Sequence, residues 1–384
     1  MGSIPKLIRS TFRDLLRLLI PMRGYKDAYK FAFIVHPRDE RDMIRRFPFL
    51  ESSPGFIKKF IQRYFWPVTV SEITGLKSNE GTSVEGFIIS IPMTAYEMMK
   101  DRKGAKRQIR KAVKLARNRG AKIAGLGALT SSLSRGGLDL LDIKGIAITT
   151  GHAYTGYNVT KTLLSKLGGV NLSTSTIGVV GAAGSIGSIS AEILADSGAR
   201  NLLLIDLDRK KELVLELKDR LEKQYSGINI DCSTDMDLLK DAVGIITATN
   251  TPEALLKNHH ISTGTIIVDD AQPSDISEEL YERDDILILE AGAVHTPGIS
   301  SNFNMGLANP NDNFCCLAEV LILASNKHTH NFVINRAKME DIEHIRKGGE
   351  ALGFEVSQPQ NERGLLSKQK IDSVLKLLHT RLSS

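Results

Sequence analysis

The sequence predicts an α/β fold built around a doubly wound parallel sheet. The apolar run at residues 177–180 ends in glycines at 181, 184 and 187, and a helical pattern follows at once. A second apolar run, at 201–205, ends in Asp206, about 20 residues farther along the chain. Later apolar segments alternate with helical ones, which is typical of a parallel sheet covered by helices on both faces.

The strand, glycine turn and helix together have the pattern of a Rossmann-type dinucleotide-binding unit. In that pattern Gly181 permits the turn, Gly184 lets the backbone approach a pyrophosphate, and Gly187 lets the helix pack closely on the strand. The first N–H groups of the helix would bind phosphate. The spacing is GxxGxxG rather than GxGxxG, so the prediction depends on the flanking strand and helix. We expect the cofactor to be held by Gly181, Ala183, Gly184, Ser185, Ile186, Gly187, Asp206, Arg209, Thr247 and Thr249.

Asp206 bears on the choice between NADH and NADPH. A carboxylate at this position accepts a hydrogen bond from a ribose 2′-hydroxyl and repels a 2′-phosphate, which favours NADH. Arg209, Lys210 and Lys211 follow closely and would instead attract a phosphate. The sequence therefore leans to NADH and leaves NADPH open.

The size of the chain favours more than one domain. Its 384 residues, 42% of them hydrophobic, suggest two domains or one domain with a large extension. We expect a basic amphipathic segment over 1–30 and an α/β substrate domain over 31–150. A dinucleotide-binding domain over 151–310 would follow. The last part, 311–384, would contain helices that carry Cys316 and return to the substrate domain.

The net charge is +6, and the basic residues are concentrated in two places. One is the first 30 residues. The other is the stretch at 102–122, most of which belongs to a long helix predicted over 94–119. Such surfaces favour acidic partners, although a solvated helix face explains the second equally well. The helix predicted over 4–20 would either lie on a membrane surface or dock on its own domain. Three cysteines, no long apolar run and no uninterrupted signal-peptide segment favour the cytoplasm.

Cys315 and Cys316 are the candidate nucleophiles. They follow Asn311, Asp312 and Asn313, any of which is a good N-cap, so both cysteines should lie in the first turn of a helix. That position favours the thiolate. The alternative is that each is a small buried apolar residue.

Other polar side chains stand at predicted strand ends. His152 and Tyr154 join a strand to a helix and would protonate a substrate oxygen, or else serve only in a capping turn. Asp269, Asp270 and His295 follow later strands and should approach a nicotinamide, or else serve only as turn and capping groups. We expect no metal site, because no CxxC, HExxH or comparable spacing occurs.

Several segments resemble the long-chain acyl-(acyl-carrier-protein) reductases of the cyanobacterial type, which make fatty aldehydes. The similarity runs in order from about residue 31 to about residue 358. GLGALTS at 125–131 is similar to that family's ALGGFTS, and TTGHAYT at 149–155 to its TTGNTHT. VVGAAGSIG at 179–187 is similar to VVGATGDIG, FCCLAE at 314–319 to FACFAE, and HTHNF at 328–332 to WHTNF.

The resemblance implies a Cys316 acyl-enzyme that is reduced by NADH or NADPH to an aldehyde. It implies acyl carrier protein or acyl-CoA as the partner, met by the basic helix, and no nucleic acid. The implied substrate and carrier contacts are Thr130, Ser131, Thr150, Arg107, Arg110 and Lys114. The chain departs from the family at His152 and Tyr154, which replace Asn and His, and at Asp206 and Leu207, which replace an Ala-Arg pair.

Two other functions remain open. The first is a dehydrogenase of a small polar acid, similar in layout to shikimate dehydrogenase, that transfers hydride directly and uses its cysteines only structurally. The second is a non-enzymatic nucleotide-binding protein associated with a membrane through the basic N-terminal helix.

Overall fold

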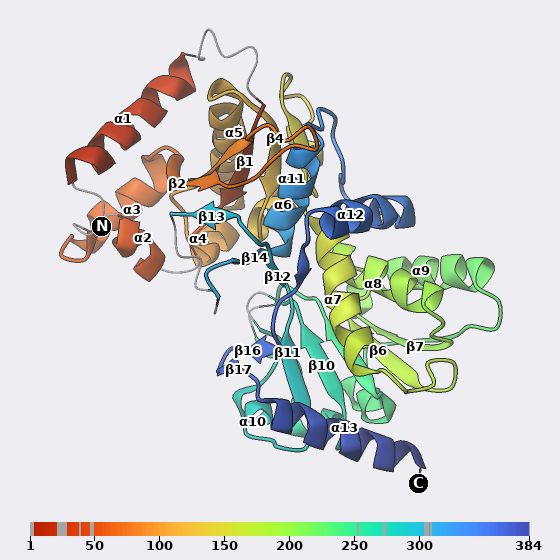
Figure 1. Ribbon diagram of the computed structural model, residues 1–384. Coiled ribbons are helices and arrows are strands. Elements are labelled where there is room, and N and C mark those ends of the chain that lie inside the picture. Colours follow the sequence, from red (N-terminus) through yellow and green to blue (C-terminus); the bar gives the residue numbers. More distant parts are fainter. Residues whose placement is uncertain are drawn as a thin grey trace. The chain divides into compact units, whose positions relative to one another are not determined.

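The computed structural model describes residues 4–20, 29–37, 40–46, 50–251, 253–271, 274–302, 307 and 309–383. The chain forms two compact units (Figure 1). Unit 1 comprises Met1–Gly151, Thr296–Arg336 and Lys347–Gly353, and unit 2 comprises His152–His295, Ala337–Arg346 and Phe354–Ser384. This division differs from the expected ranges: Gly151 and residues 296–310 belong to unit 1, whereas Ala337–Arg346 and the C-terminal tail from Phe354 belong to unit 2.

Unit 2 contains a six-stranded, fully parallel sheet. Its strands are β6 (Thr176–Val180), β7 (Asn201–Ile205), β8 (Asn229–Ser233), β9 (Gly244–Thr247), β10 (Ile266–Asp269) and β11 (Leu287–Glu290). They lie side by side in the order β11-β10-β9-β6-β7-β8. Numbered from β6, this is the strand order 3-2-1-4-5-6 of the doubly wound Rossmann sheet, so the predicted fold class is confirmed.

Alternate residues of these strands enter two separate cores. Leu202 and Leu204 of β7 pack in one core, whereas Leu203 and Ile205 pack in the other. Because successive side chains of a strand point to opposite faces, the sheet must be covered on both sides. This requirement explains why the strands read as continuous apolar runs in the sequence.

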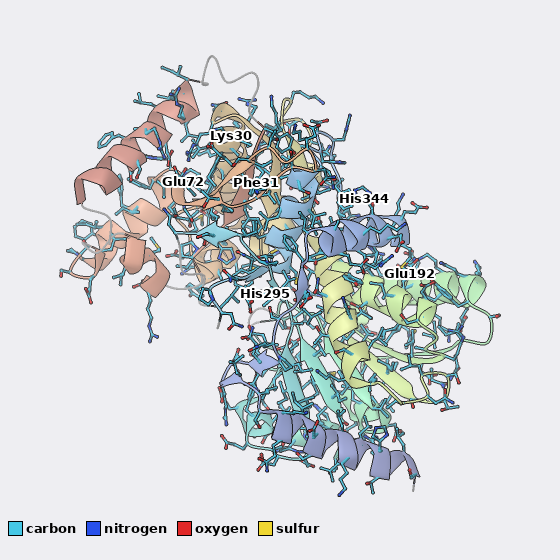
Figure 2. The ribbon with its side chains drawn as sticks, in the orientation of Figure 1. Lys30, Phe31, Glu72, Glu192, His295 and His344 are labelled. Carbon is cyan, nitrogen blue, oxygen red and sulfur yellow. The ribbon has the colours of Figure 1, made fainter. Side chains whose placement is uncertain are left out.

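Helices cover this sheet and are held together by close contacts. The first core includes α7 (His152–Lys166), α8 (Ser185–Asp196), α9 (Lys211–Gln224) and part of α13 (Lys368–Ser383). Gly156 lets α7 approach α8, because a Cβ there would lie 2.4 Å from Ile189. Glu192 of α8, labelled in Figure 2, forms an ion pair with Arg220 of α9. The second core includes α10 (Glu278–Tyr281).

Unit 1 contains a second six-stranded sheet, which is mixed. Its strands are β1 (Lys30–Val35), β2 (Val68–Thr74), β3 (Glu85–Ser90), β4 (Ala121–Leu126), β5 (Ala147–Thr149) and β13 (Ser300–Ser301). The order is β13-β2-β3-β1-β4-β5, with β13 and β2 antiparallel to their neighbours and the others parallel. The short strand β14 (Asp312–Phe314) and the hairpin of β16 (Gln360–Asn361) and β17 (Gly364–Leu365) lie outside the two large sheets.

The long basic helix predicted over 94–119 is wrong as a single helix. The structure has α4 (Ala95–Lys100) and α5 (Arg102–Asn118), and the Asp101 carboxylate between them accepts a hydrogen bond from the Gly104 N–H at 2.8 Å. This bond caps α5 and ends α4. The apolar side of α5 packs on the unit 1 sheet.

Helix α11 (Cys315–Ser325) packs against strands β1 and β4 of the same sheet. Gly125 of β4 provides the space, because a Cβ there would lie 2.0 Å from Val320. All residues of α11 except Cys316 are buried. This burial explains why the helix reads as apolar on every side.

Helix α1 (Ile4–Leu19) docks on unit 1 through polar groups. The buried Asp14 carboxylate accepts a hydrogen bond from the Thr69 N–H at 2.6 Å, and the Trp66 indole donates one to the Thr11 carbonyl at 3.1 Å. Phe12 and Leu16 remain exposed on the helix surface. Among the described helices, none combines the length and the apolar character needed to cross a bilayer.

Candidate functional site

The glycine turn after β6 is built on contacts between backbone atoms. Gly181 has φ +83°, a conformation that side-chain-bearing residues rarely adopt. A Cβ on Gly187 would lie 2.3 Å from the Gly181 carbonyl oxygen, and one on Gly184 would lie 3.0 Å from the same atom. Substitution of any of the three glycines would therefore displace the turn.

Helix α8 begins directly after this turn, with Gly184 as its N-cap and no side chain capping it. The first N–H groups of a helix have no carbonyl partner within the helix, and helix N-termini of this kind bind anions. Gly184, Ser185 and Ile186 are partly exposed there, whereas Gly181 and Gly187 are buried. The turn thus presents backbone N–H groups at an accessible helix N-terminus, and this geometry fits the pyrophosphate of a dinucleotide.

Asp206 braces this turn. Its side chain is only 3% exposed; one carboxylate oxygen accepts from the Ala183 N–H at 2.9 Å and the other from the Leu207 N–H at 2.8 Å. The Lys210 ammonium lies 3.2 Å from the carboxylate, and Arg209 next to it is exposed. The carboxylate expected to bind ribose therefore also joins the end of β7 to the glycine turn.

Three carboxyl groups gather where β9 and β10 end. The Asp269 carboxylate accepts hydrogen bonds from the Thr247 hydroxyl at 2.6 Å and from the Ser274 hydroxyl at 2.5 Å. The buried Asp275 carboxylate accepts from the Thr249 hydroxyl at 2.6 Å. Thr247 and Thr249, expected at the cofactor, thus lie at the carboxyl ends of the strands, where open α/β sheets bind their ligands.

Among the carboxyl groups at this edge of the sheet, Asp270 has the pKa that is shifted most. Burial, together with the charges of Asp269 and Glu290, raises its pKa to about 8. Burial also raises the pKa of Asp275 to about 6, although the hydrogen bond from Thr249 acts to lower this pKa. This edge of the sheet therefore holds a carboxyl group that exchanges a proton near neutral pH.

A pocket lies beside the end of β11. It has a volume of about 320 Å³, within the range of small-molecule sites. Its lining combines polar and charged residues, Thr162, Ser165, Lys166, Glu290, Ser357, Gln358 and Gln360, with the apolar residues Leu289, Ala291, Ala293, Val356 and Pro359. Such a lining suits a small molecule that carries both polar and apolar groups.

Cys316 lies in unit 1, at the second position of α11. The N-cap of α11 is Phe314, so the prediction that Asn311, Asp312 or Asn313 caps it is wrong. Asn313 is buried and its amide donates to the Thr296 hydroxyl at 2.6 Å. Cys315 is buried and Cys316 half-buried.

The Cys316 side chain is packed against Gly151. A Cβ on Gly151, which has φ +79°, would lie 2.3 Å from the Cys316 Cβ. The buried Glu319 carboxylate accepts from the Gly151 N–H at 3.0 Å and from the Thr149 hydroxyl. These contacts join the end of β5 to the start of α11 within unit 1.

The remaining predicted polar residues belong to α7 and to unit 1. His152 and Tyr154 lie in the first turn of α7, where Tyr154 is buried, and this turn directly follows Gly151, which packs against Cys316. In unit 1, the buried Thr130 hydroxyl donates to the Gly127 carbonyl at 2.7 Å, and Ser131 is buried in α6 (Leu129–Leu133). The buried Thr150 hydroxyl has no hydrogen-bond partner in the described part of the chain.

The basic helix α5 is partly neutralised by its own chain. Arg110 binds the Asp142 carboxylate through two hydrogen bonds of 2.8 and 2.6 Å, and Lys106 lies 2.8 Å from Asp139. Arg107 and Lys114 are exposed, as expected of a solvated helix face. Ion pairs within the chain therefore account for part of the positive charge that was predicted to bind a carrier protein.

Comparisons with known proteins match unit 2 to a dehydrogenase family. Residues 162–293 match the family model described as shikimate/quinate 5-dehydrogenase. Aminotransferase PigE of Serratia sp. is 23% identical over 364 residues, covering 91% of this chain and 42% of that protein. The chain thus spans less than half the length of this relative.

Two of the solved structures that show some similarity are the following. Quinate dehydrogenase from Corynebacterium glutamicum in complex with NAD is 14% identical, with a TM-score of 0.32 over 64% of this chain and 80% of that one. The nucleotide-binding domain of glutamyl-tRNA reductase from Thermoplasma volcanium is 18% identical, with a TM-score of 0.26 over 34% of this chain and 82% of that one.

The resemblance to acyl-(acyl-carrier-protein) reductases is therefore wrong, and so are the functions and partners that it implied. The family that matches is one of shikimate/quinate dehydrogenases, and it indicates neither acyl thioesters, fatty aldehydes nor an acyl carrier protein. The pairing of Arg110 with Asp142 also removes one of the cations assigned to carrier binding.

Gly187→Ala should disrupt the glycine turn. The added methyl would meet the Gly181 backbone at 2.3 Å, and such overpacking costs about 1–3 kcal/mol. We expect binding of NADH and NADPH, followed by nicotinamide fluorescence, to weaken at least about tenfold. Gly168→Ala is the matched control, because its methyl would meet nothing closer than 3.9 Å. Wild-type affinity in Gly187→Ala would exclude this turn as the binding site.

Asp270 should make stability fall as the pH rises. Its pKa is raised from 3.8 to about 8, so the folded chain retains a proton that the unfolded chain releases above about pH 4. Between pH 5 and 8 the free energy of unfolding, measured with urea, should fall more for the wild type than for Asp270→Asn, by at least about 1 kcal/mol. Asp219→Asn, an exposed substitution on α9, should follow the wild type. Parallel curves for wild type and Asp270→Asn would contradict the assignment.

Proposed function

We propose that this chain is an NAD(P)-dependent dehydrogenase that interconverts a small polar hydroxy acid and its ketone by direct hydride transfer. The observation that carries the proposal is the glycine turn, with its backbone contacts, its partly exposed helix N-terminus and the Asp206 brace. The bound nicotinamide would supply or accept the hydride. The family match over residues 162–293 supports the same reaction class.

Residues of unit 2 would hold the cofactor. The N–H groups at the start of α8 would bind the pyrophosphate, and the segment after β7 would meet the adenosine ribose. The Asp206 carboxylate is paired with Lys210, which reduces the repulsion that a 2′-phosphate would meet there. Either NAD(H) or NADP(H) would therefore serve as the cofactor of the proposed enzyme, and the exposed Arg209 is the group that would favour NADP(H).

Asp270 would accept the proton of the alcohol. When hydride leaves the carbinol carbon, the hydroxyl O–H bond breaks, its electrons form the carbonyl, and the proton passes to the Asp270 carboxylate. An efficient general base has a pKa near the working pH, and the pKa of Asp270 is about 8. Its place directly after β10 puts it at the edge where ligands of open α/β sheets bind.

The proposed substrate class rests on the family match and on the pocket beside β11. Ser165 and Gln358 in the pocket lining would hydrogen-bond substrate hydroxyls, and Lys166 would attract a carboxylate. A hydroxylated carboxylic acid meets both requirements. Because the chain spans 42% of aminotransferase PigE, that protein's activity is not part of the proposal.

In this reaction Cys316 has a packing role. Its Cβ fills the space left by Gly151, and the neighbouring polar contacts are supplied by Glu319. Direct hydride transfer forms no covalent bond to the enzyme, so the thiol is not consumed or regenerated.

The test is an assay of quinate, shikimate and other small hydroxy acids with NAD⁺ and NADP⁺, followed by the absorbance of the reduced nicotinamide. At least one hydroxy acid should reduce the cofactor, and Cys316→Ser, which keeps the Cβ, should leave that rate unchanged. Asp270→Asn should lower kcat by about 100-fold or more without changing cofactor affinity. Loss of activity in Cys316→Ser with intact nucleotide binding would contradict direct transfer.

A further inference from the structure

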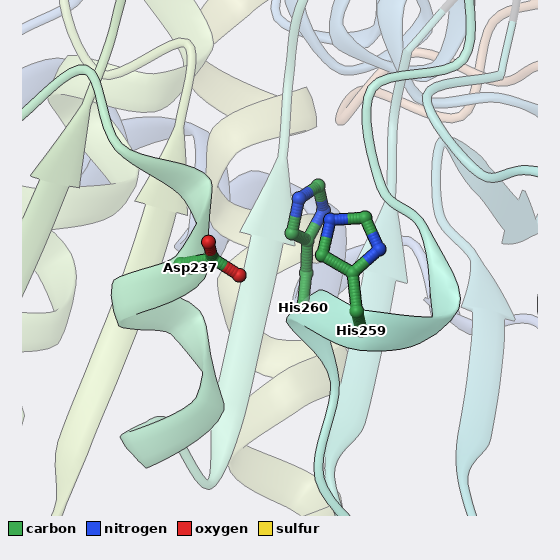
Figure 3. A group of neighbouring side chains, drawn as sticks. All are labelled: Asp237, His259 and His260. Atoms are coloured by element: carbon green, nitrogen blue, oxygen red, sulfur yellow. The ribbon is translucent and has the colours of Figure 1, made fainter.

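The structure brings together two histidines and an aspartate that the sequence analysis did not connect. Asp237 belongs to the 3-10 helix η4 (Met236–Asp241), and His259 and His260 form most of the 3-10 helix η5 (Asn258–His260). One carboxylate oxygen and one nitrogen from each ring lie within 4.8 Å of one another. Figure 3 shows the three side chains converging from two separate segments.

These groups have the chemistry of a transition-metal site. Two imidazoles and one carboxylate are common ligands of zinc and its first-row neighbours, which prefer nitrogen to the all-oxygen sites of magnesium or calcium. The carboxylate remains able to bind, because only one Asp237 oxygen engages the Lys240 ammonium, at 2.9 Å. The side chain of Asp237 is about half exposed, which leaves an entry path for an ion.

The surroundings of His260 decide which of its ring nitrogens can bind an ion. His260 is 8% exposed, and a neutral imidazole is the form that binds metal. The Lys257 N–H donates to the His260 Nδ1 at 3.1 Å, so the other ring nitrogen, Nε2, is the one left for an ion. Binding there requires the opposite tautomer and gives up this one bond.

We propose that Asp237, His259 and His260 bind one divalent ion of the cobalt, nickel, copper and zinc group. Water would complete the coordination sphere. The ion would link η4, which precedes β9, to η5, which precedes β10, beside the existing bond from the Ser262 hydroxyl to the Lys240 carbonyl at 2.8 Å.

The site lies away from the proposed chemistry. Both 3-10 helices lead into strands, so they stand at the amino ends of β9 and β10, whereas the glycine turn follows the carboxyl end of β6. In a parallel sheet these are opposite edges. The ion would therefore stabilise unit 2 without taking part in hydride transfer.

The test uses the full chain without a histidine tag, treated with chelator and then titrated with Zn²⁺ by calorimetry. We expect one equivalent to bind and the Tm to rise, because an ion that binds only the folded state stabilises it. His259→Ala and Asp237→Asn should each weaken binding at least about tenfold and remove the rise in Tm. Both positions are exposed, so the variants should fold.

His379→Ala, an exposed histidine of α13 in the same unit, is the control and should bind as the wild type does. Absorption of the Co²⁺ complex provides a second readout, and its visible bands should disappear in His259→Ala. Absence of binding to the wild type, or equal affinity in His259→Ala and the wild type, would overturn the proposal.

Discussion

The candidate site depends on one close backbone contact, that of Gly187 with the Gly181 carbonyl. The 2.3 Å left for a Cβ there means that α8 packs directly on the end of β6 without any side chain between them. That contact brings the helix N-terminus to the end of the strand, where its N–H groups would face the proposed cofactor. Asp206, directly after β7, is joined to the same turn, because its carboxylate accepts a hydrogen bond from the Ala183 N–H. The three glycines and the carboxylate therefore act as one structural unit.

Close packing at a glycine also explains how the cysteine segment of unit 1 is held in place. Gly151 must lack a side chain because Cys316 occupies that space, and Glu319 binds the Gly151 N–H and the Thr149 hydroxyl. The segments at 149–155 and 314–319 are thus linked by packing and hydrogen bonding. Their joint similarity to an acyl reductase misled the sequence interpretation, because local motifs that are linked by packing do not by themselves require thioester chemistry.

The sequence predicted those features that depend on local pattern. Five strands of unit 2 were visible as apolar runs because both faces of the sheet are buried, whereas β8 was missed because exposed and buried residues are mixed in this edge strand. The break at Asp101 was missed because the basic residues on both sides continue a helical pattern. The second role of Asp206, the raised pKa of Asp270 and the meeting of Asp237 with His259 all arise from tertiary contacts, which spacing along the chain does not reveal.

The most direct test of the account is a titration of the intact chain with NADH and NADPH, followed by nicotinamide fluorescence. The account predicts saturable binding of one dinucleotide per chain, with a Kd below about 1 mM for at least one of the two. Binding should compete with ADP-ribose, which shares the pyrophosphate and not the nicotinamide. Absence of saturable binding of both nucleotides would contradict the claim that the Gly181–Gly187 turn holds a redox cofactor.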